Sequence, residues 1–260
     1  MGSDTCVFCG ATGDCAKITK EHLFPAWVNT VLTPQVIGPS VSNTRTWGSK
    51  HQAPQSKTWP VNAPSTATVR IVCAPCNNGW MSDLEEAVKP ILEGPILGRG
   101  GVRFTPDQEL DLATWACMKT MVFEYFWPDD AQVFTSADRT ILRTHGLPPA
   151  TARIDIAAVE SKGQPVQAFR VAYSSPGQRP DRPQADDLSL CMTMAIGCFV
   201  VQVRGGPGAG EHGFTAFGRV RTDSVSIFPP SLPHAAWPPA VPFNDDTLRA
   251  FAHPRTPIED

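Results

Sequence analysis

Two pairs of cysteines with the spacing of metal ligands occur in the first third of this 260-residue chain. Each pair is a Cys-x-x-Cys, and together they supply Cys6, Cys9, Cys73 and Cys76. Four thiolates form a tetrahedral zinc site that leaves no coordination position open, so such a site is structural. The alternatives are four unrelated buried cysteines, or Cys15 as a replacement for one ligand. The paired spacing favours one four-cysteine zinc site.

An adjacent acid and imidazole, Glu21 and His22, could divide two catalytic tasks. The carboxylate can hold a hard divalent cation through oxygen, while the imidazole takes a proton from water. Histidine suits the role of base because its unperturbed pKa lies near about 6.5. Taken alone, a Glu-His pair is more often a solvated surface pair.

Asn77 directly follows the last cysteine of the second pair. Its amide oxygen is a neutral, hard ligand suited to Mg²⁺ or a similar ion. The competing interpretation is a turn, because Asn-Asn-Gly favours left-handed backbone conformations. The two interpretations are compatible if Asn78 and Gly79 form the turn while Asn77 binds the ion.

These residues need a strand and a helix to position them. The β-branched stretch at 67–73 predicts a strand that delivers the second cysteine pair. Ser82 followed by Glu85 matches a capping box, which predicts that a helix begins at Ser82. We expect Pro90 to kink or end that helix and Gly94 to stop it.

Further helices are expected at 105–127, 136–146 and 245–252. The first has Thr105 as its cap and Pro106 at its first position. One apolar stripe is predicted along it, consisting of Leu110, Ala113, Cys117, Met121 and Phe126. From residue 151 onward, the sequence consists of apolar stretches typical of strands, separated by Gly and Pro. Strands are predicted within 152–159, 167–173, 189–205, 213–220 and 224–228.

The resulting prediction is an α+β chain with three segments. Residues 1–95 form a zinc-braced module with a long insertion at about 33–66. Residues 96–150 form a helical segment, and residues 151–260 form a β-rich domain of unknown role.

The order Cys-x-x-Cys, Glu-His-x-x-Pro, strand, Cys-x-x-Cys-Asn, helix resembles the HNH endonuclease superfamily, the ββα-metal nucleases. The zinc-braced branch, which includes the endonuclease VII type and uncharacterised bacterial HNH endonucleases, is the most similar. The resemblance rests on the four cysteines, Glu21, His22, Pro25 and Asn77, and its motifs cover residues 6–86.

The resemblance implies an N-terminal ββα-metal fold and a DNA endonuclease. His22 would be the general base, and Glu21 and Asn77 would bind a catalytic Mg²⁺ or Mn²⁺. Many family members have Asp in place of Glu21 and a further polar ligand where this chain has Met81. Asp83, Glu85 and Glu86 could replace that ligand, although Glu85 is also assigned to the helix cap. The alternative function is a zinc-braced nucleic-acid or protein-binding module that keeps the fold without cleavage.

Composition limits the partners only weakly. The net charge is −3, and residues 1–100 hold eight Lys/Arg against seven Asp/Glu, so no strong basic field marks a nucleic-acid surface. No apolar run approaches the roughly twenty residues that span a bilayer, and no signal peptide is recognisable. We therefore expect a cytoplasmic protein that binds no membrane. The resemblance implies a nucleic-acid partner, DNA in the first place. A homodimer is left open.

Overall fold

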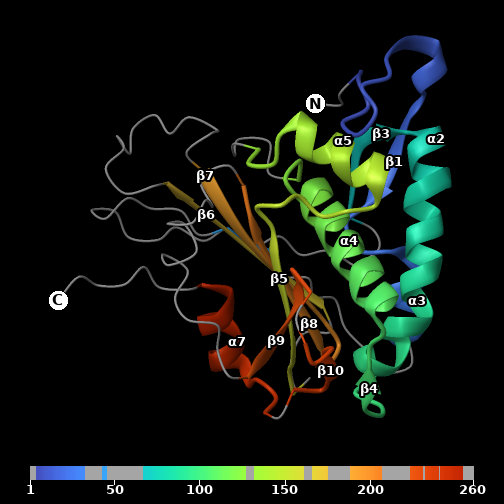
Figure 1. Cartoon of the computed structure of the whole chain (residues 1–260). Coiled ribbons are helices and arrows are strands. Elements are labelled where there is room, and N and C mark those ends of the chain that lie inside the picture. The colour runs from blue at the N-terminus through green and yellow to red at the C-terminus, as the bar shows by residue number, and fades with distance from the viewer. Residues whose placement is uncertain are drawn as a thin grey trace.

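A six-stranded sheet covered by helices forms the larger part of the chain in the computed structural model (Figure 1). The chain has an α+β fold, as the sequence predicts. The described residues are 4–32, 43–45, 67–126, 132–160, 166–174, 188–206, 223–230, 232–239 and 241–253.

The N-terminal part contains two antiparallel strands followed by a helix. β1 (Ile18–His22) pairs with β3 (Thr68–Cys73), which confirms the strand predicted at 67–73. The chain then enters the short helix α2 (Ala74–Cys76) without a loop. A π-helical turn (Asn77–Met81) leads directly into α3 (Ser82–Ile96).

α3 begins at Ser82, as predicted, but the predicted capping box and the predicted stop at Gly94 are wrong. The residue before Ser82 is already helical, and no side-chain cap bond is present, so Ser82 and Glu85 form no capping box. The helix also continues through Pro90 and past Gly94 to Ile96. Its buried face stabilises the helix across both positions, because tertiary packing outweighs local propensity.

The helix α4 (Pro106–Phe123) crosses the centre of the molecule. Thr105 and Gln108 form a capping box at its start, and Pro106 takes the first helical position, which confirms the predicted cap. The expected single stripe is wrong, because every residue from 112 to 123 is buried. This helix packs against α3, α5 (Ser136–His145) and the sheet, so it exposes no polar face over these residues.

The sheet has the strand order β2-β6-β7-β8-β5-β9, and all its pairs are antiparallel except β2 with β6. Its strands are β2 (Asn43–Arg45), β5 (Arg153–Ala158), β6 (Val166–Ser174), β7 (Leu188–Ile196), β8 (Phe199–Gly205) and β9 (Ser224–Phe228). The 189–205 stretch thus folds into two strands. The strand predicted at 213–220, and all of the 33–66 insertion except β2, lie outside the described residues.

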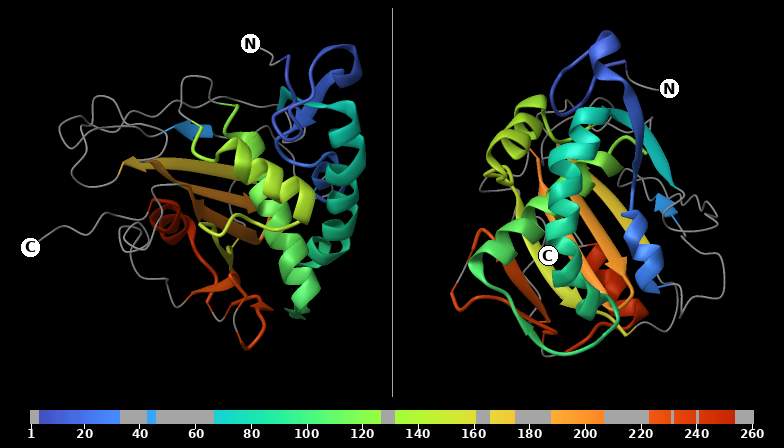
Figure 2. Two further views of the ribbon diagram at one scale, coloured as in Figure 1. Left: turned by 45° about the horizontal axis from the view of Figure 1, so that its top comes forward. Right: turned by 90° about the vertical axis from the view of Figure 1, so that its right-hand side faces the viewer.

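Helices cover both faces of this sheet. The layer of α3, α4 and α5 lies on one face, and α7 (Asp245–Ala252) lies on the other (Figure 2). The α7 face is apolar where Phe243, Leu248 and Phe251 pack against sheet residues such as Val200. α7 has the bounds predicted from the sequence, with Asn244 as its cap.

The β7–β8 turn packs closely against the end of α3. Gly197 has φ +56°, and a Cβ there would lie 2.2 Å from the carbonyl oxygen of Ile96. The next amide, that of Cys198, donates a 2.9 Å hydrogen bond to the same oxygen. Only glycine combines this backbone conformation with so close an approach.

Smaller elements complete the fold. These are a 3₁₀ turn (Gly13–Ala16), α1 (Ala26–Leu32) and the antiparallel pair β4 (Val102–Arg103) with β10 (Ala236–Trp237). One continuous cluster of buried apolar side chains extends from Cys6 to Trp237 through all three predicted segments. The division of the chain into domains stays a prediction. Among the described residues, no helix has the length and apolar character needed to cross a bilayer.

Candidate metal centre and adjoining polar pocket

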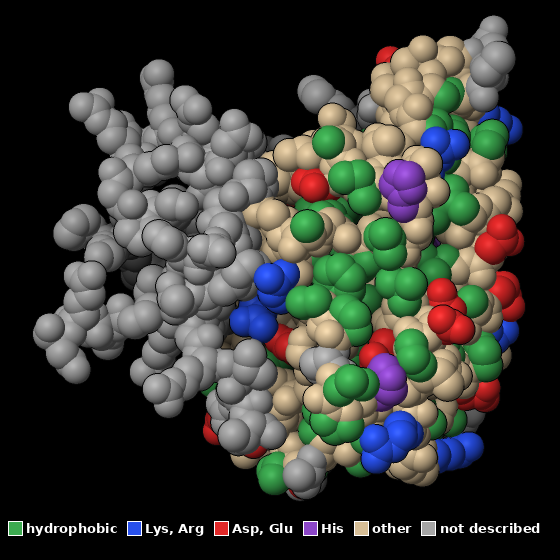
Figure 3. All heavy atoms as spheres, in the orientation of Figure 1, with side chains coloured by type: hydrophobic (Ala, Val, Ile, Leu, Met, Phe, Trp, Pro, Cys, Tyr) green, Lys and Arg blue, Asp and Glu red, His purple; other side chains and the backbone are tan. Residues whose placement is uncertain are grey.

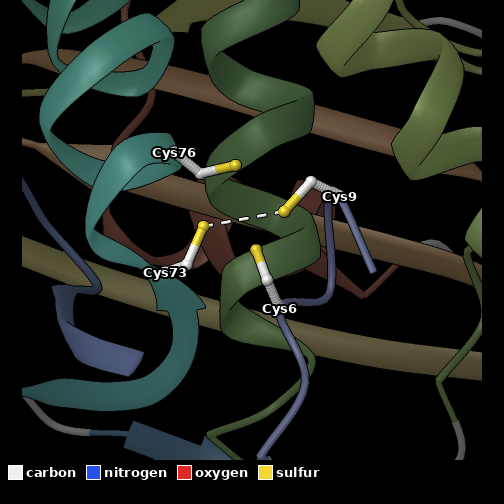
Figure 4. Close-up of side chains that lie close together, drawn as sticks. All are labelled: Cys6, Cys9, Cys73 and Cys76. Carbon is white, nitrogen blue, oxygen red and sulfur yellow. Dashed lines mark hydrogen bonds between the residues drawn. The ribbon is translucent and has the colours of Figure 1, made fainter. Parts of the chain in front are cut away.

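The four predicted cysteine ligands lie close together, with their sulfur atoms pointing toward one another (Figure 4). The Sγ atoms of Cys6, Cys9, Cys73 and Cys76 all lie within 4.8 Å of one another, and Cys9 Sγ is 3.6 Å from Cys73 Sγ. Ligands about 2.3 Å from a tetrahedral zinc ion lie about 3.8 Å apart. The cluster could therefore bind a metal ion such as zinc. The side chain of the alternative ligand Cys15 lies outside the described part of the chain.

Local structure explains how the two distant pairs meet. The first pair forms a tight knuckle, in which Gly10 has φ +70° and its amide donates to the carbonyl of Cys6. The amide of Val7 then donates to the carbonyl of Ile71, which fastens the knuckle to β3. The second pair straddles the junction between β3 and α2, so one strand end presents both thiols.

The four thiols have unequal acidities. Burial raises the pKa of Cys6, but hydrogen bonds from backbone amides, that of Cys73 foremost, outweigh burial and lower its pKa to about 7. Burial raises the pKa values of Cys73 and Cys76, and nearby thiols raise them further. Several thiolates together therefore need a cation to balance their charge, as zinc does in a four-cysteine site.

A polar cavity of about 130 Å³ adjoins this centre. It brings together Glu21 and His22 from the end of β1 and Asn77 from the π-helical turn, the three residues predicted to be catalytic. The rest of the lining consists of Ala26, Asn78, Met81, Ser82 and Glu85. Glu21 is buried and His22 is half-buried.

A register shift between Thr19 and Lys20 lies immediately before the Glu-His pair. Irregularities of this kind re-aim the side chains that follow them. Asn77 fixes this irregularity, because its Nδ2 donates to Thr19 Oγ1 at 2.9 Å and to the Lys20 carbonyl at 3.1 Å. Both described bonds use the amide nitrogen, so the oxygen is left for a ligand. The assignment of Asn77 as a metal ligand stays a prediction.

The predicted turn at Asn78 and Gly79 is absent. The helix instead widens to a π-helical turn over Asn77–Met81, and Gly79 adopts φ −102° and ψ −118°. Among the described residues, only glycines have a positive φ. The Asn-Asn-Gly sequence therefore forms a kink at Gly79 between two helical stretches, and Asn77 and Asn78 lie on the cavity wall.

Two carboxylates of the cavity share one buried lysine, which the sequence analysis did not single out. Lys119 Nζ lies 2.7 Å from Glu21 Oε1 and 2.5 Å from Glu85 Oε1. It also donates to the carbonyl of His22 at 3.1 Å. Glu85 is therefore part of the pocket, and it is not occupied by a helix cap.

The lysine remains a cation despite its burial. Removal from water would lower the pKa of Lys119, but the neighbouring carboxylates of Glu21 and Glu85 outweigh this and raise the pKa above its usual value. Between two carboxylates the ammonium is the favoured form. Two acids and the imidazole of His22 thus line the pocket, and one fixed cation is paired with both acids.

The molecular surface has mixed charge on the face that carries the helical layer (Figure 3). Lys and Arg side chains lie in small separate groups there, and apolar side chains gather near the centre. The positive charges that this view shows are therefore distributed over the face.

Comparisons with protein-family models, with curated proteins and with solved structures found no match to this chain.

Proposed function

We propose that this protein is a metal-dependent endonuclease that hydrolyses phosphodiester bonds in DNA. The observation that carries the proposal is the shared cavity of Glu21, His22 and Asn77. Asn77 lies more than fifty positions from the adjacent Glu21 and His22, and the resemblance of the sequence pattern predicts that the three share one site. A base and oxygen ligands around one small cavity are the components of metal-assisted hydrolysis.

Each residue of the cavity has a distinct role in this proposal. Glu21 and Asn77 would hold one Mg²⁺ or Mn²⁺ through oxygen, and Glu85 is the candidate for the further ligand that the sequence left open. When bound, the cation supplies Lewis-acid stabilisation of the charge on the phosphate and on the leaving oxygen.

His22 would activate the attacking water. Its imidazole accepts a proton from the water as the water oxygen forms a bond to phosphorus. The bond from phosphorus to the 3′ oxygen breaks, and that oxygen takes a proton from solvent. The products are a 5′-phosphate and a 3′-hydroxyl.

The four cysteines would bind zinc in a structural role. Zinc at this centre would hold the knuckle, the end of β3 and the start of α2 together. Asn77 follows directly in the chain and contacts β1, so the position of the cavity depends on the same junction.

A binding module without cleavage is the second candidate, and one contact favours it. The ammonium of Lys119 already neutralises part of the charge of Glu21 and Glu85. A pocket that needs no divalent cation could keep the fold and bind nucleic acid or a protein only. Cation binding at the pocket separates this candidate from the nuclease.

The proposal is tested by nicking of supercoiled plasmid, with duplex, branched and single-stranded DNA as further substrates. Zinc-loaded protein should cleave when Mg²⁺ or Mn²⁺ is added and should not cleave without either ion. Absence of cleavage on every substrate, with zinc fully bound, would favour the binding module.

A further inference from the structure

Lys119 is a charged side chain in an otherwise apolar part of the molecule. It lies in the middle of α4 and is fully buried, between neighbours such as Met118 and Met121 that are fully buried as well. α4 follows the N-terminal strands and α3 in the chain and packs against α3. The buried ammonium thus comes from outside residues 1–95 and contacts two carboxylates that line the cavity.

All three N–H donors of the ammonium have an acceptor within reach. The acceptors are Glu21 Oε1, Glu85 Oε1 and the His22 carbonyl, at 2.7, 2.5 and 3.1 Å. An ammonium without partners in such a place would cost several kcal/mol, and an apolar side chain would pack there without that cost. Packing alone therefore does not explain a lysine at this position.

Glu21 and Glu85 each both pair with Lys119 and line the cavity. The described bonds from Lys119 use one oxygen, Oε1, of Glu21 and of Glu85. Both acids line the cavity, so their charge acts on whatever the cavity binds. Two carboxylates and one ammonium leave the pocket with one net negative charge when His22 is neutral.

We propose that Lys119 is a positioning residue and the fixed counter-ion of the candidate metal pocket. It holds Glu21 and Glu85 in one orientation, and it limits the attraction of the pocket for a divalent cation. This inference rests on the proposed function, because it takes the pocket to be a cation site. It also makes α4 a part of that site.

The test is Mn²⁺ binding to the zinc-loaded full-length protein, measured by isothermal titration calorimetry. Lys119→Met should bind Mn²⁺ at least about tenfold more tightly, because a positive charge close to the cation is removed. Glu85→Gln should bind Mn²⁺ at least about tenfold more weakly, because one negative charge is lost. A lysine with only a structural role predicts no tightening.

A double variant keeps the test valid if Lys119→Met does not fold. Glu85→Gln with Lys119→Met restores one net negative charge, so it should bind Mn²⁺ at least about tenfold more tightly than Glu85→Gln alone. Lys17→Met, which removes an exposed lysine, is the matched control and should leave the affinity unchanged.

Three results would overturn the inference. They are unchanged or weaker Mn²⁺ binding by folded Lys119→Met, a double variant that binds no more tightly than Glu85→Gln, and no measurable Mn²⁺ binding by any of these proteins. A wild type that binds Mn²⁺ with the predicted pattern but does not cleave DNA refutes the nuclease alone. If wild type cleaves DNA but the Mn²⁺ affinity is the same with and without Lys119, only this inference is refuted.

Discussion

The side-chain amide of Asn77 donates a 2.9 Å hydrogen bond to Thr19 Oγ1, across 58 positions of sequence. Thr19 Oγ1 in turn donates to the Val72 carbonyl at 3.2 Å, so one chain of bonds links the π-helical turn, β1 and β3. The Glu-His pair begins two residues after Thr19. The geometry of the cavity therefore depends on this link.

Asn77→Ala should reduce the free energy of unfolding by about 1–3 kcal/mol, because it leaves the Lys20 carbonyl and Thr19 without their donor. Urea unfolding of the zinc-loaded protein measures the change. Asn78→Ala removes an exposed neighbour and should change stability by less than about 0.5 kcal/mol. Equal stability of the two variants would show that the link contributes nothing.

The metal centre predicts one equivalent of zinc per chain. Cys73→Ser should lose that zinc and unfold at a lower temperature, because the remaining three thiols leave one coordination position open. Metal analysis after dialysis against metal-free buffer is the measurement. Cys198→Ser alters a cysteine outside the cluster and should keep its zinc. Full zinc retention by Cys73→Ser would argue against the four-cysteine site.

A buried ion pair joins Glu124, the residue that follows α4, to α5. Arg139 Nη2 lies 2.8 Å from Glu124 Oε2, and both side chains are buried. Arg139→Met should reduce the free energy of unfolding by about 3–5 kcal/mol at neutral pH, because it leaves the carboxylate buried without its cation. Arg143→Met, which alters an exposed residue of the same helix, is the control and should be nearly neutral.

The loss of folding stability caused by Arg139→Met should become smaller as the pH falls. Burial, the largest influence, raises the pKa of Glu124, and Arg139 opposes this. Without Arg139 the folded state holds a proton that the unfolded state, with its usual pKa near 4.5, releases. Stability of the variant is then lost as the pH rises from about 4.5 through the raised pKa. Unfolding curves at several pH values test the trend, and a cost independent of pH would contradict it.

Local signals in the sequence predicted several elements well. Thr105 with Pro106 marks the start of α4, because capping depends on residues within one turn, and the helix expected at 245–252 has the bounds of α7. The cysteine cluster was predictable for a similar reason. Its spacing is a local requirement of tetrahedral coordination, repeated twice.

Long-range contacts limited the remaining predictions. Ser82 and Glu85 match a capping box, yet the residue before Ser82 is already helical and Glu85 pairs with a lysine on another helix. Lys119 is separated from Glu21 by 98 positions, so no local pattern marks their contact. The available signal was a single lysine within an apolar helical run, a position that needs a buried partner.

The central claim is tested most directly by the initial rate of plasmid nicking in Mg²⁺ or Mn²⁺. Zinc-loaded wild type is compared with His22→Ala and with the control His145→Ala, which removes an exposed histidine from α5. The account predicts that His22→Ala lowers the rate about 100-fold or more while His145→Ala cleaves like wild type. Cleavage by zinc-loaded His22→Ala at the wild-type rate would contradict it.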